Sequence, residues 1–132
     1  MQPVTYSWTP VIVIHTLVAL LAVLLGAWLL SARKGHLAHR IGGWLWVLCM
    51  ATMAGVSFAI RGPSGYSWIH GLSVVTLVTL ATGVLAARAH RVQAHRANMI
   101  SLYVGALVIT GLFTLLPGRL LGREVWGWLG LA

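Results

Sequence analysis

Four long apolar stretches alternate with short polar connections along the chain. The stretches cover roughly residues 10–32, 37–60, 68–87 and 97–116. A helix that crosses a bilayer needs about 20 mostly apolar residues, and each stretch reaches that length. The pattern predicts four transmembrane helices, the last of which ends at Pro117-Gly118.

The connections divide the chain into two helical hairpins. The segment 61–67 reads Arg-Gly-Pro-Ser-Gly-Tyr-Ser and is rich in turn-forming residues. The connections within each hairpin are short and basic. Small residues would let the helices approach closely, and seven glycines are candidates for such contacts: Gly26, Gly42, Gly43, Gly55, Gly83, Gly105 and Gly111.

Composition supports the bilayer as solvent. Hydrophobic residues make up 59% of the chain and charged residues 8%, whereas soluble domains carry about 25% charged residues. The net charge of +8 would suggest nucleic acid in a soluble protein. Here the basic residues lie between apolar segments, as topology signals do, so we expect lipid and no nucleic acid as partner.

The basic residues predict an orientation. Six lie in the first and third connections, and three lie on the opposite side. The positive-inside rule then places both termini outside, in a bacterial inner membrane. Trp8, Trp68, Trp126 and Trp128 fall at outer boundaries, and the tail 125–132 resembles an interfacial piece. The six inner residues are Arg33, Lys34, Arg40, Arg88, Arg91 and Arg96.

The two hairpins also repeat in sequence. Ile14-His15 matches Ile69-His70 at a shift of 55 residues, and Ala38-His39-Arg40 matches Ala94-His95-Arg96 at a shift of 56. Tandem hairpins of the same sense are related by a pseudo-twofold axis along the membrane normal. We therefore expect one all-α domain over residues 1–132, a transmembrane four-helix bundle with repeats at about 10–60 and 68–117.

Four histidines are the candidate site. The repeat pairs His15 with His70 near the outer face and His39 with His95 near the inner face. Ionisable residues at membrane depth usually face the protein interior, and bundles build cofactor sites there. Two imidazoles that face each other can hold a haem iron from both sides. This arrangement predicts one or two b-type haems with these four histidines as iron ligands.

Nearby residues suit such a cofactor. Gly26 and Ala81 correspond in the repeat, and small side chains would leave room beside a flat macrocycle. Arg40 and Arg96 follow the inner histidines and would pair with haem propionates, or extend to lipid phosphates.

Other interpretations of the histidines stay open. Each could be a buried neutral imidazole or an interfacial residue without a cofactor. His36, His39, His90 and His95 could instead form a zinc or copper site. With such a site the chain would be a metal-binding membrane protein. Without any cofactor it would be a non-catalytic membrane subunit or a lipid-binding module. No nucleophile is accompanied by an acid and a base in the sequence, which disfavours a hydrolase.

The layout resembles a known superfamily. Two hairpins with His15, His70, His39 and His95 so arranged that alternate helices share a haem are similar to the cytochrome b561 superfamily. The resemblance implies a transmembrane electron carrier that passes electrons across the membrane. A quinone or a redox protein would be its partner, within a homo-oligomer or a larger complex. Any enzymatic activity would be that of an oxidoreductase.

A second resemblance is carried by the sequence itself. His95-Arg96-Ala-Asn98-Met99 with Tyr103 and the later Gly105, Gly111, Phe113-Thr114, Pro117 and Arg119 is similar to the last helix of an uncharacterised family of bacterial four-helix membrane proteins. His70 followed by Thr76-Leu77 is similar to its third helix. This resemblance implies fold and membership, and it implies no chemistry.

Overall fold

The computed structural model describes residues 8–59, 68–116 and 119–130, and this part of the chain is helical without strands. The fold is thus all-α, as expected, while segment 61–67 and Pro117-Gly118 lie outside the described residues. The helices, in chain order, are α1 (Pro10–Ser31), α2 (Leu37–Ser57), α3 (Trp68–Arg88), α4 (Val92–Leu102), the π-helix η1 (Tyr103–Ile109), α5 (Thr110–Thr114) and α6 (Leu120–Trp128).

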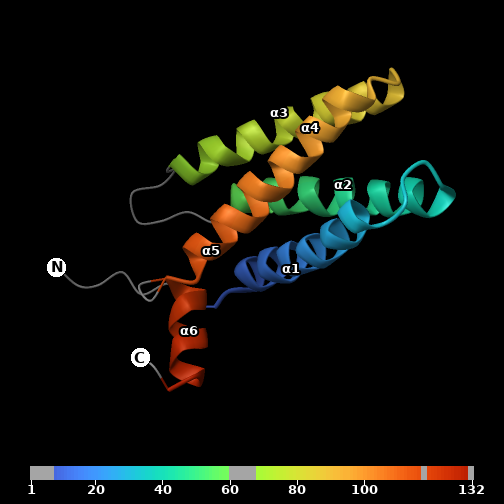
Figure 1. Cartoon of the computed structure of the whole chain (residues 1–132). Coiled ribbons are helices and arrows are strands. Elements are labelled where there is room, and N and C mark those ends of the chain that lie inside the picture. Colours follow the sequence, from blue (N-terminus) through green and yellow to red (C-terminus); the bar gives the residue numbers. More distant parts are fainter. Residues whose placement is uncertain (1–7, 60–67, 117–118, 131–132) are drawn as a thin grey trace.

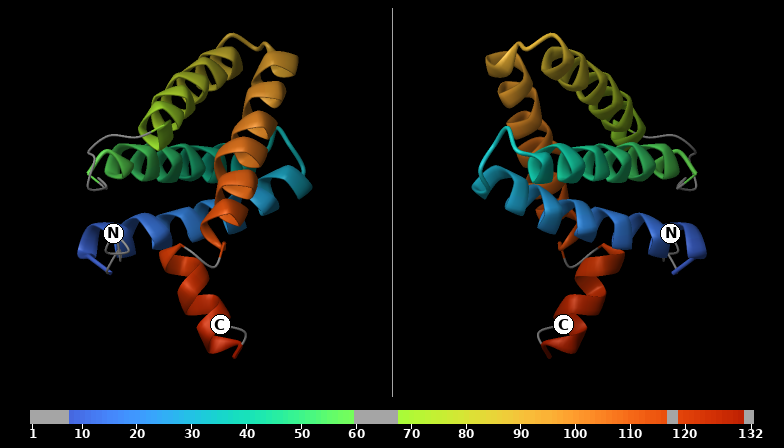
Figure 2. Two further views of the ribbon diagram at one scale, coloured as in Figure 1. Left: turned by 90° about the vertical axis from the view of Figure 1, so that its left-hand side faces the viewer. Right: turned by 90° about the vertical axis from the view of Figure 1, so that its right-hand side faces the viewer.

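Two hairpins, α1–α2 and α3–α4, form the body of the molecule (Figure 1). Helix α1 packs on α2, α2 on α3 and α3 on α4, and η1 closes the arrangement against α1. The two hairpin connections lie at the same end of the molecule, and the hairpins diverge towards them (Figures 1 and 2). Helix α6 lies at the opposite end and runs across it (Figure 1).

The outer surface of this arrangement is apolar. Leu24 on α1, Leu85 on α3 and Leu112 on α5 are 70%, 62% and 63% exposed. Such an extended apolar surface is unfavourable in water and matches a lipid environment. Within the described residues, three helical stretches are long and apolar enough to cross a membrane: Pro10–Ser31, His70–Arg88 and Val92–Thr114.

The bounds of α1 and α3 agree with the sequence expectation within one residue, and α2 ends at Ser57, three residues before the expected end. We expected the fourth segment to begin at about residue 97, but α4 begins at Val92, so the α3–α4 connection is shorter than expected. The fourth segment also changes hydrogen-bond register at η1. There the Thr110 hydroxyl donates to the Gly105 carbonyl, five residues earlier, at 2.9 Å. Hydropathy cannot predict such a π segment, because the segment remains apolar and helical throughout.

The core is organised around Gly26, where three helices meet. The Trp46 indole N–H of α2 donates to the Ala22 carbonyl of α1 at 3.0 Å. The Tyr103 hydroxyl of η1 donates to the adjacent Val23 carbonyl at 3.0 Å. Both rings reach the α1 backbone because Gly26, one turn later, carries no side chain. The surrounding cluster consists of Ala22, Leu29, Trp46, Met50, Met53, Leu80, Leu102 and Leu107.

Only some of the seven glycines have the expected role. At Gly42 a Cβ would lie 2.8 Å from the Trp28 ring, and at Gly83 it would overlap the Met99 side chain. At Gly55 and Gly111, which match in the repeat, a Cβ would meet nothing within 4 Å. The expectation of close contact was wrong there, because these glycines do not lie at a helix interface. The same holds for Gly43 and Gly105.

We expect Gly26→Ala to destabilise the protein. Its Cβ would lie 2.6 Å from the Tyr103 ring and 2.8 Å from the Trp46 indole nitrogen, so both rings must move and their hydrogen bonds to α1 lengthen. Overpacking of this kind costs about 1–3 kcal/mol. Thermal unfolding in detergent, followed by Trp fluorescence, measures the loss.

Gly55→Ala is the matched control, because Gly55 is also helical but has open space around its Cα. Alanine is favoured over glycine within a helix by about 0.5–1 kcal/mol, so this variant should unfold at the same or a higher temperature. Equal behaviour of the two variants would contradict the proposed packing at Gly26.

The α3–α4 turn places a histidine in an unfavourable conformation. His90 is exposed and has a positive φ of 58°. The His90 and Arg91 amides donate to the Ala87 and Ala86 carbonyls at 3.1 and 2.8 Å, which is the Schellman pattern at a helix C-terminus. Glycine is the residue that this position favours, so His90 occupies the position that glycine usually takes in this motif.

His90→Gly should stabilise the protein by about 1 kcal/mol, because glycine adopts positive φ without the Cβ clash that histidine has. His90→Ala removes the same imidazole but keeps the Cβ, and it should give no gain. The two unfolding temperatures decide the point: a gain from both variants, or from neither, would show that the backbone conformation is not the cause.

Candidate histidine sites

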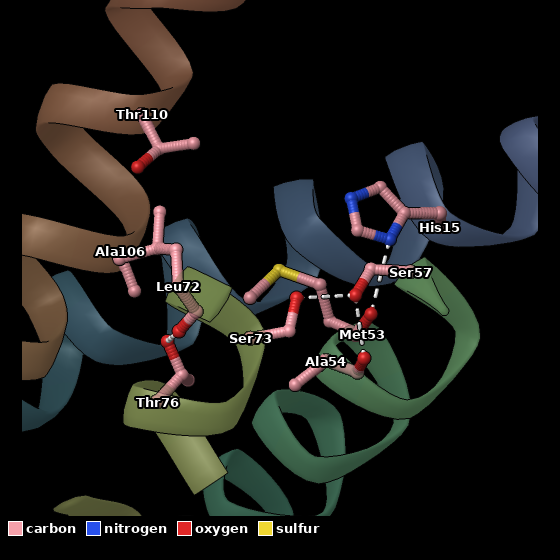
Figure 3. Close-up of a pocket in the computed structure, with 9 residues that line it drawn as sticks. All are labelled: His15, Met53, Ala54, Ser57, Leu72, Ser73, Thr76, Ala106 and Thr110. Carbon is pink, nitrogen blue, oxygen red and sulfur yellow. Dashed lines mark hydrogen bonds between the residues drawn. The ribbon is translucent and has the colours of Figure 1, made fainter. Parts of the chain in front are cut away.

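His15 on α1 is oriented by the neighbouring helix. Its Nδ1 lies 3.1 Å from the Met53 carbonyl oxygen of α2. A carbonyl only accepts, so Nδ1 carries the proton and Nε2 of the neutral ring is left as an acceptor. Figure 3 shows the Nε2 edge of the ring turned away from Met53, towards the side of the chamber where Thr110 lies.

The His15 ring borders a small chamber between the hairpins. The chamber measures about 70 Å³ and lies where α1, α2, α3 and the fourth segment approach one another (Figure 3). Its lining combines polar side chains with methyl and thioether groups. The residues are His15, Met53, Ala54, Ser57, Leu72, Ser73, Thr76, Ala106 and Thr110.

The hydroxyl groups of the chamber are bonded to nearby backbone. Ser57 donates to the Ala54 carbonyl at 2.6 Å and contacts the Ser73 hydroxyl of α3. Thr76 donates to the Leu72 carbonyl at 2.8 Å. Because the Ser57 and Thr76 hydroxyl groups donate to helix carbonyls, both present lone pairs rather than donors to the chamber. Most polar groups of the chamber therefore have hydrogen-bond partners, although the surrounding protein is apolar.

His70, the expected partner of His15, does not line this chamber. It is buried, with 7% of its surface exposed, and its ring lies 6.0 Å from the Phe58 ring, centroid to centroid, just after α2. His15 also contacts the end of α2, at Met53. The structure thus places both histidines at the same end of the molecule and against α2, but it does not join them in one cavity.

At the other end, His95 on α4 repeats the geometry of His15. Its Nδ1 lies 2.9 Å from the Gly83 carbonyl oxygen of α3, which again leaves Nε2 as the free acceptor. The Asn98 amide, one turn later, donates to the Thr82 hydroxyl at 3.1 Å. These bonds tie the α3–α4 hairpin together and fix the direction of the His95 ring.

His39 on α2 has a different environment. Its Nδ1 is buried and has no hydrogen-bond partner, a condition that typically costs about 1–3 kcal/mol. His39 and His95 both lie in the first turn of their helices, at the end of the molecule where the two hairpin connections are (Figure 1). The hairpins diverge towards this end (Figures 1 and 2), so the pairing of the two rings stays a prediction of the repeat.

The described residues contain no group of three or more histidine, cysteine, aspartate or glutamate side chains that could hold a metal ion. His36 and His90 are both exposed. A zinc or copper site built from them with His39 and His95 thus has no support in the described part of the chain. Arg40 and Arg96, the predicted propionate partners, are also exposed.

Gly26 does not provide the expected room for a macrocycle. The Tyr103 and Trp46 rings occupy the space beside it, and its repeat counterpart Ala81 is exposed on the outside of α3. That expectation was wrong. The spacing of small residues along a helix shows where space is available, but it does not show which neighbouring side chains fill that space.

Sequence reasoning also missed the hydroxyl groups of the chamber. Ser73 and Thr76 lie three residues apart and follow His70 by three and six, so they share one helical face with it. That spacing could have predicted that Ser73 and Thr76 lie together. No sequence pattern predicts that Ser57 and Thr110 approach them, because this depends on how the hairpins pack.

A helical chain with three stretches able to cross a bilayer and an apolar outer surface is a multispanning membrane protein. The family model described as "Predicted membrane protein (DUF2306)" matches residues 12–126. The chain therefore belongs to this family of membrane proteins of unknown function, which agrees with the resemblance to an uncharacterised family. No curated protein and no solved structure matches the chain.

Proposed function

We propose that this chain is a four-span electron carrier of the bacterial inner membrane that binds a b-type haem between His39 and His95. The proposal has two parts. In the first, α2 crosses the membrane together with the three apolar stretches. In the second, a cofactor binds at the inner end of the molecule. The observations that carry the proposal are the buried Nδ1 of His39, which has no hydrogen-bond partner, and the oriented imidazole of His95 at the same end of the molecule.

The exposed face of α2 supports the fourth span. Ile41, Trp44, Leu45 and Leu48 are 54%, 54%, 52% and 61% exposed. Their spacing of three, four and seven residues forms one stripe on the helix, which would be costly to leave in water. With α2 in the bilayer, the two basic connections share one side, which the positive-inside rule assigns to the cytoplasm.

The inner histidines have the chemistry that haem iron requires. Imidazoles that bind a metal usually donate their second ring N–H to a carbonyl or carboxylate, which fixes the ring. His95 has this arrangement through Gly83. His39 has a buried ring nitrogen that an iron, or a group brought in with the cofactor, would satisfy.

The outer pair fits a haem less well. The chamber beside His15 measures about 70 Å³, whereas pockets for drug-sized ligands measure roughly 300–1,000 Å³. A haem there would require α1 and α3 to separate. We therefore propose one haem at the inner pair, and ligation by His15 and His70 remains a prediction.

A haem held in this way would supply a one-electron redox centre near the inner face. The chain would orient the iron through His39 and His95 and shield it with apolar helices. Arg40 and Arg96 lie beside these ligands in sequence, and their positive charges would stabilise the propionates. A membrane quinone is the natural electron donor or acceptor, since it reaches such a site from within the bilayer.

The test is spectroscopic. The chain is produced with a haem precursor, purified in detergent and examined by absorbance before and after dithionite. We expect a Soret band with sharp α and β bands on reduction, at one haem per chain. His39→Ala and His95→Ala should each abolish the low-spin spectrum, because one of the two axial ligands is lost.

His36→Ala and His90→Ala are the matched controls, since both remove an exposed imidazole from the same end of the molecule. Both variants should retain the full spectrum. A protein that remains colourless after haem is offered would contradict the proposal. A spectrum lost only in His15→Ala or His70→Ala would place the haem at the outer pair instead.

A further inference from the structure

Helix α6 is held to the end of the fourth segment by several close contacts. The Trp126 indole N–H donates to the Leu115 carbonyl at 2.8 Å, and the Arg119 guanidinium lies 4.6 Å from the centre of the Phe113 ring. At Gly122 a Cβ would overlap the Leu116 carbonyl. These close contacts therefore fix the direction of α6 relative to the fourth segment.

These contacts turn α6 away from the direction of the hairpins, so that it projects from their end (Figures 1 and 2). In a bilayer crossed by these stretches, a helix in this position would lie at the level of the lipid headgroups. Trp128 is 87% exposed and Leu129 51% exposed. Tryptophan favours this layer, because its ring is apolar and its N–H is polar.

The outward face of α6 contains the only acidic residue of the 132-residue chain. Glu124 is exposed and lies one helical turn before Trp128, so both share one face. Together with Val125 and Leu129 they line an open hollow. The carboxylate attracts a cation, and the exposed indole offers its ring face for a cation–π contact. The two aliphatic side chains form an apolar surface beside them.

We propose that this hollow binds the ammonium headgroup of a zwitterionic phospholipid such as phosphatidylethanolamine. The ammonium would lie between the Glu124 carboxylate and the Trp128 ring, and the acyl chains would follow Val125 and Leu129 towards the bilayer. Glu124 selects this class of lipid, because its charge repels the phosphate of anionic lipids without an ammonium group. The site is independent of the proposed haem.

The test is native mass spectrometry of the full chain in detergent with equimolar phosphatidylethanolamine and phosphatidylglycerol of identical acyl chains. The wild-type protein should retain more phosphatidylethanolamine. Glu124→Gln and Trp128→Leu should each lower that retention by roughly threefold, as expected for exposed charge and cation–π contacts, and leave phosphatidylglycerol unchanged. Both side chains are exposed, so the variants should fold.

Three further variants separate this site from general lipid binding. Arg123→Gln changes an exposed charge on the same helix outside the hollow and should not lower phosphatidylethanolamine retention. Gly122→Ala should lower it by displacing α6, whereas Gly127→Ala, with open space around it, should not. Equal retention of the two lipids by the wild-type protein, or unchanged retention in Glu124→Gln, would overturn the proposal.

Discussion

The Trp46 indole and the Tyr103 hydroxyl donate to two consecutive carbonyls of α1, those of Ala22 and Val23. The Trp46 bond holds α2 to α1 within the first hairpin, and the Tyr103 bond joins that hairpin to the fourth segment. Apolar contacts between helices contribute little in lipid, because lipid tails are equally apolar, so close packing and hydrogen bonds between helices decide the arrangement. Each such bond contributes about 0.6 kcal/mol on average, and Gly26 permits both.

The same kind of bond recurs at both ends of the molecule and defines the candidate site. His15 reaches a carbonyl of α2, and His95 reaches one of α3. Each bond fixes a ring and leaves Nε2 as an acceptor, which serves packing and metal ligation equally well. His39 differs from these two, because its buried Nδ1 has no hydrogen-bond partner. This nitrogen, together with the small size of the chamber beside His15, directs the functional proposal to the inner pair.

The sequence predicted what depends on hydropathy and length. The helices α1 and α3 begin and end within one residue of the expected bounds, because their apolar runs are bounded by clear capping and polar residues. Thr9 caps α1 through the Ile12 amide, and Arg88 ends α3. The inner histidines lie at the same end of the molecule, each in the first turn of its helix.

The pattern of residue types could not predict the features that depend on how the helices pack. The π segment η1, the filled space beside Gly26 and the open space at Gly55 and Gly111 follow from how the fourth segment crosses α1. The chamber hydroxyls come together for the same reason. His15 and His70 match in sequence, yet they have different neighbours, so equal positions in a repeat do not guarantee equal surroundings.

The number of membrane crossings underlies the whole account, and cysteine accessibility in sealed vesicles tests it most directly. In a Cys49→Ala background, single cysteines replace Gly35, His90 or Leu129, and a membrane-impermeant maleimide is added from one side. Four crossings predict that positions 35 and 90 react from the same side, the cytoplasmic one, and that position 129 reacts from the other. If α2 does not cross the membrane, positions 35 and 90 will react from opposite sides, and the proposed topology with its inner haem site would be wrong.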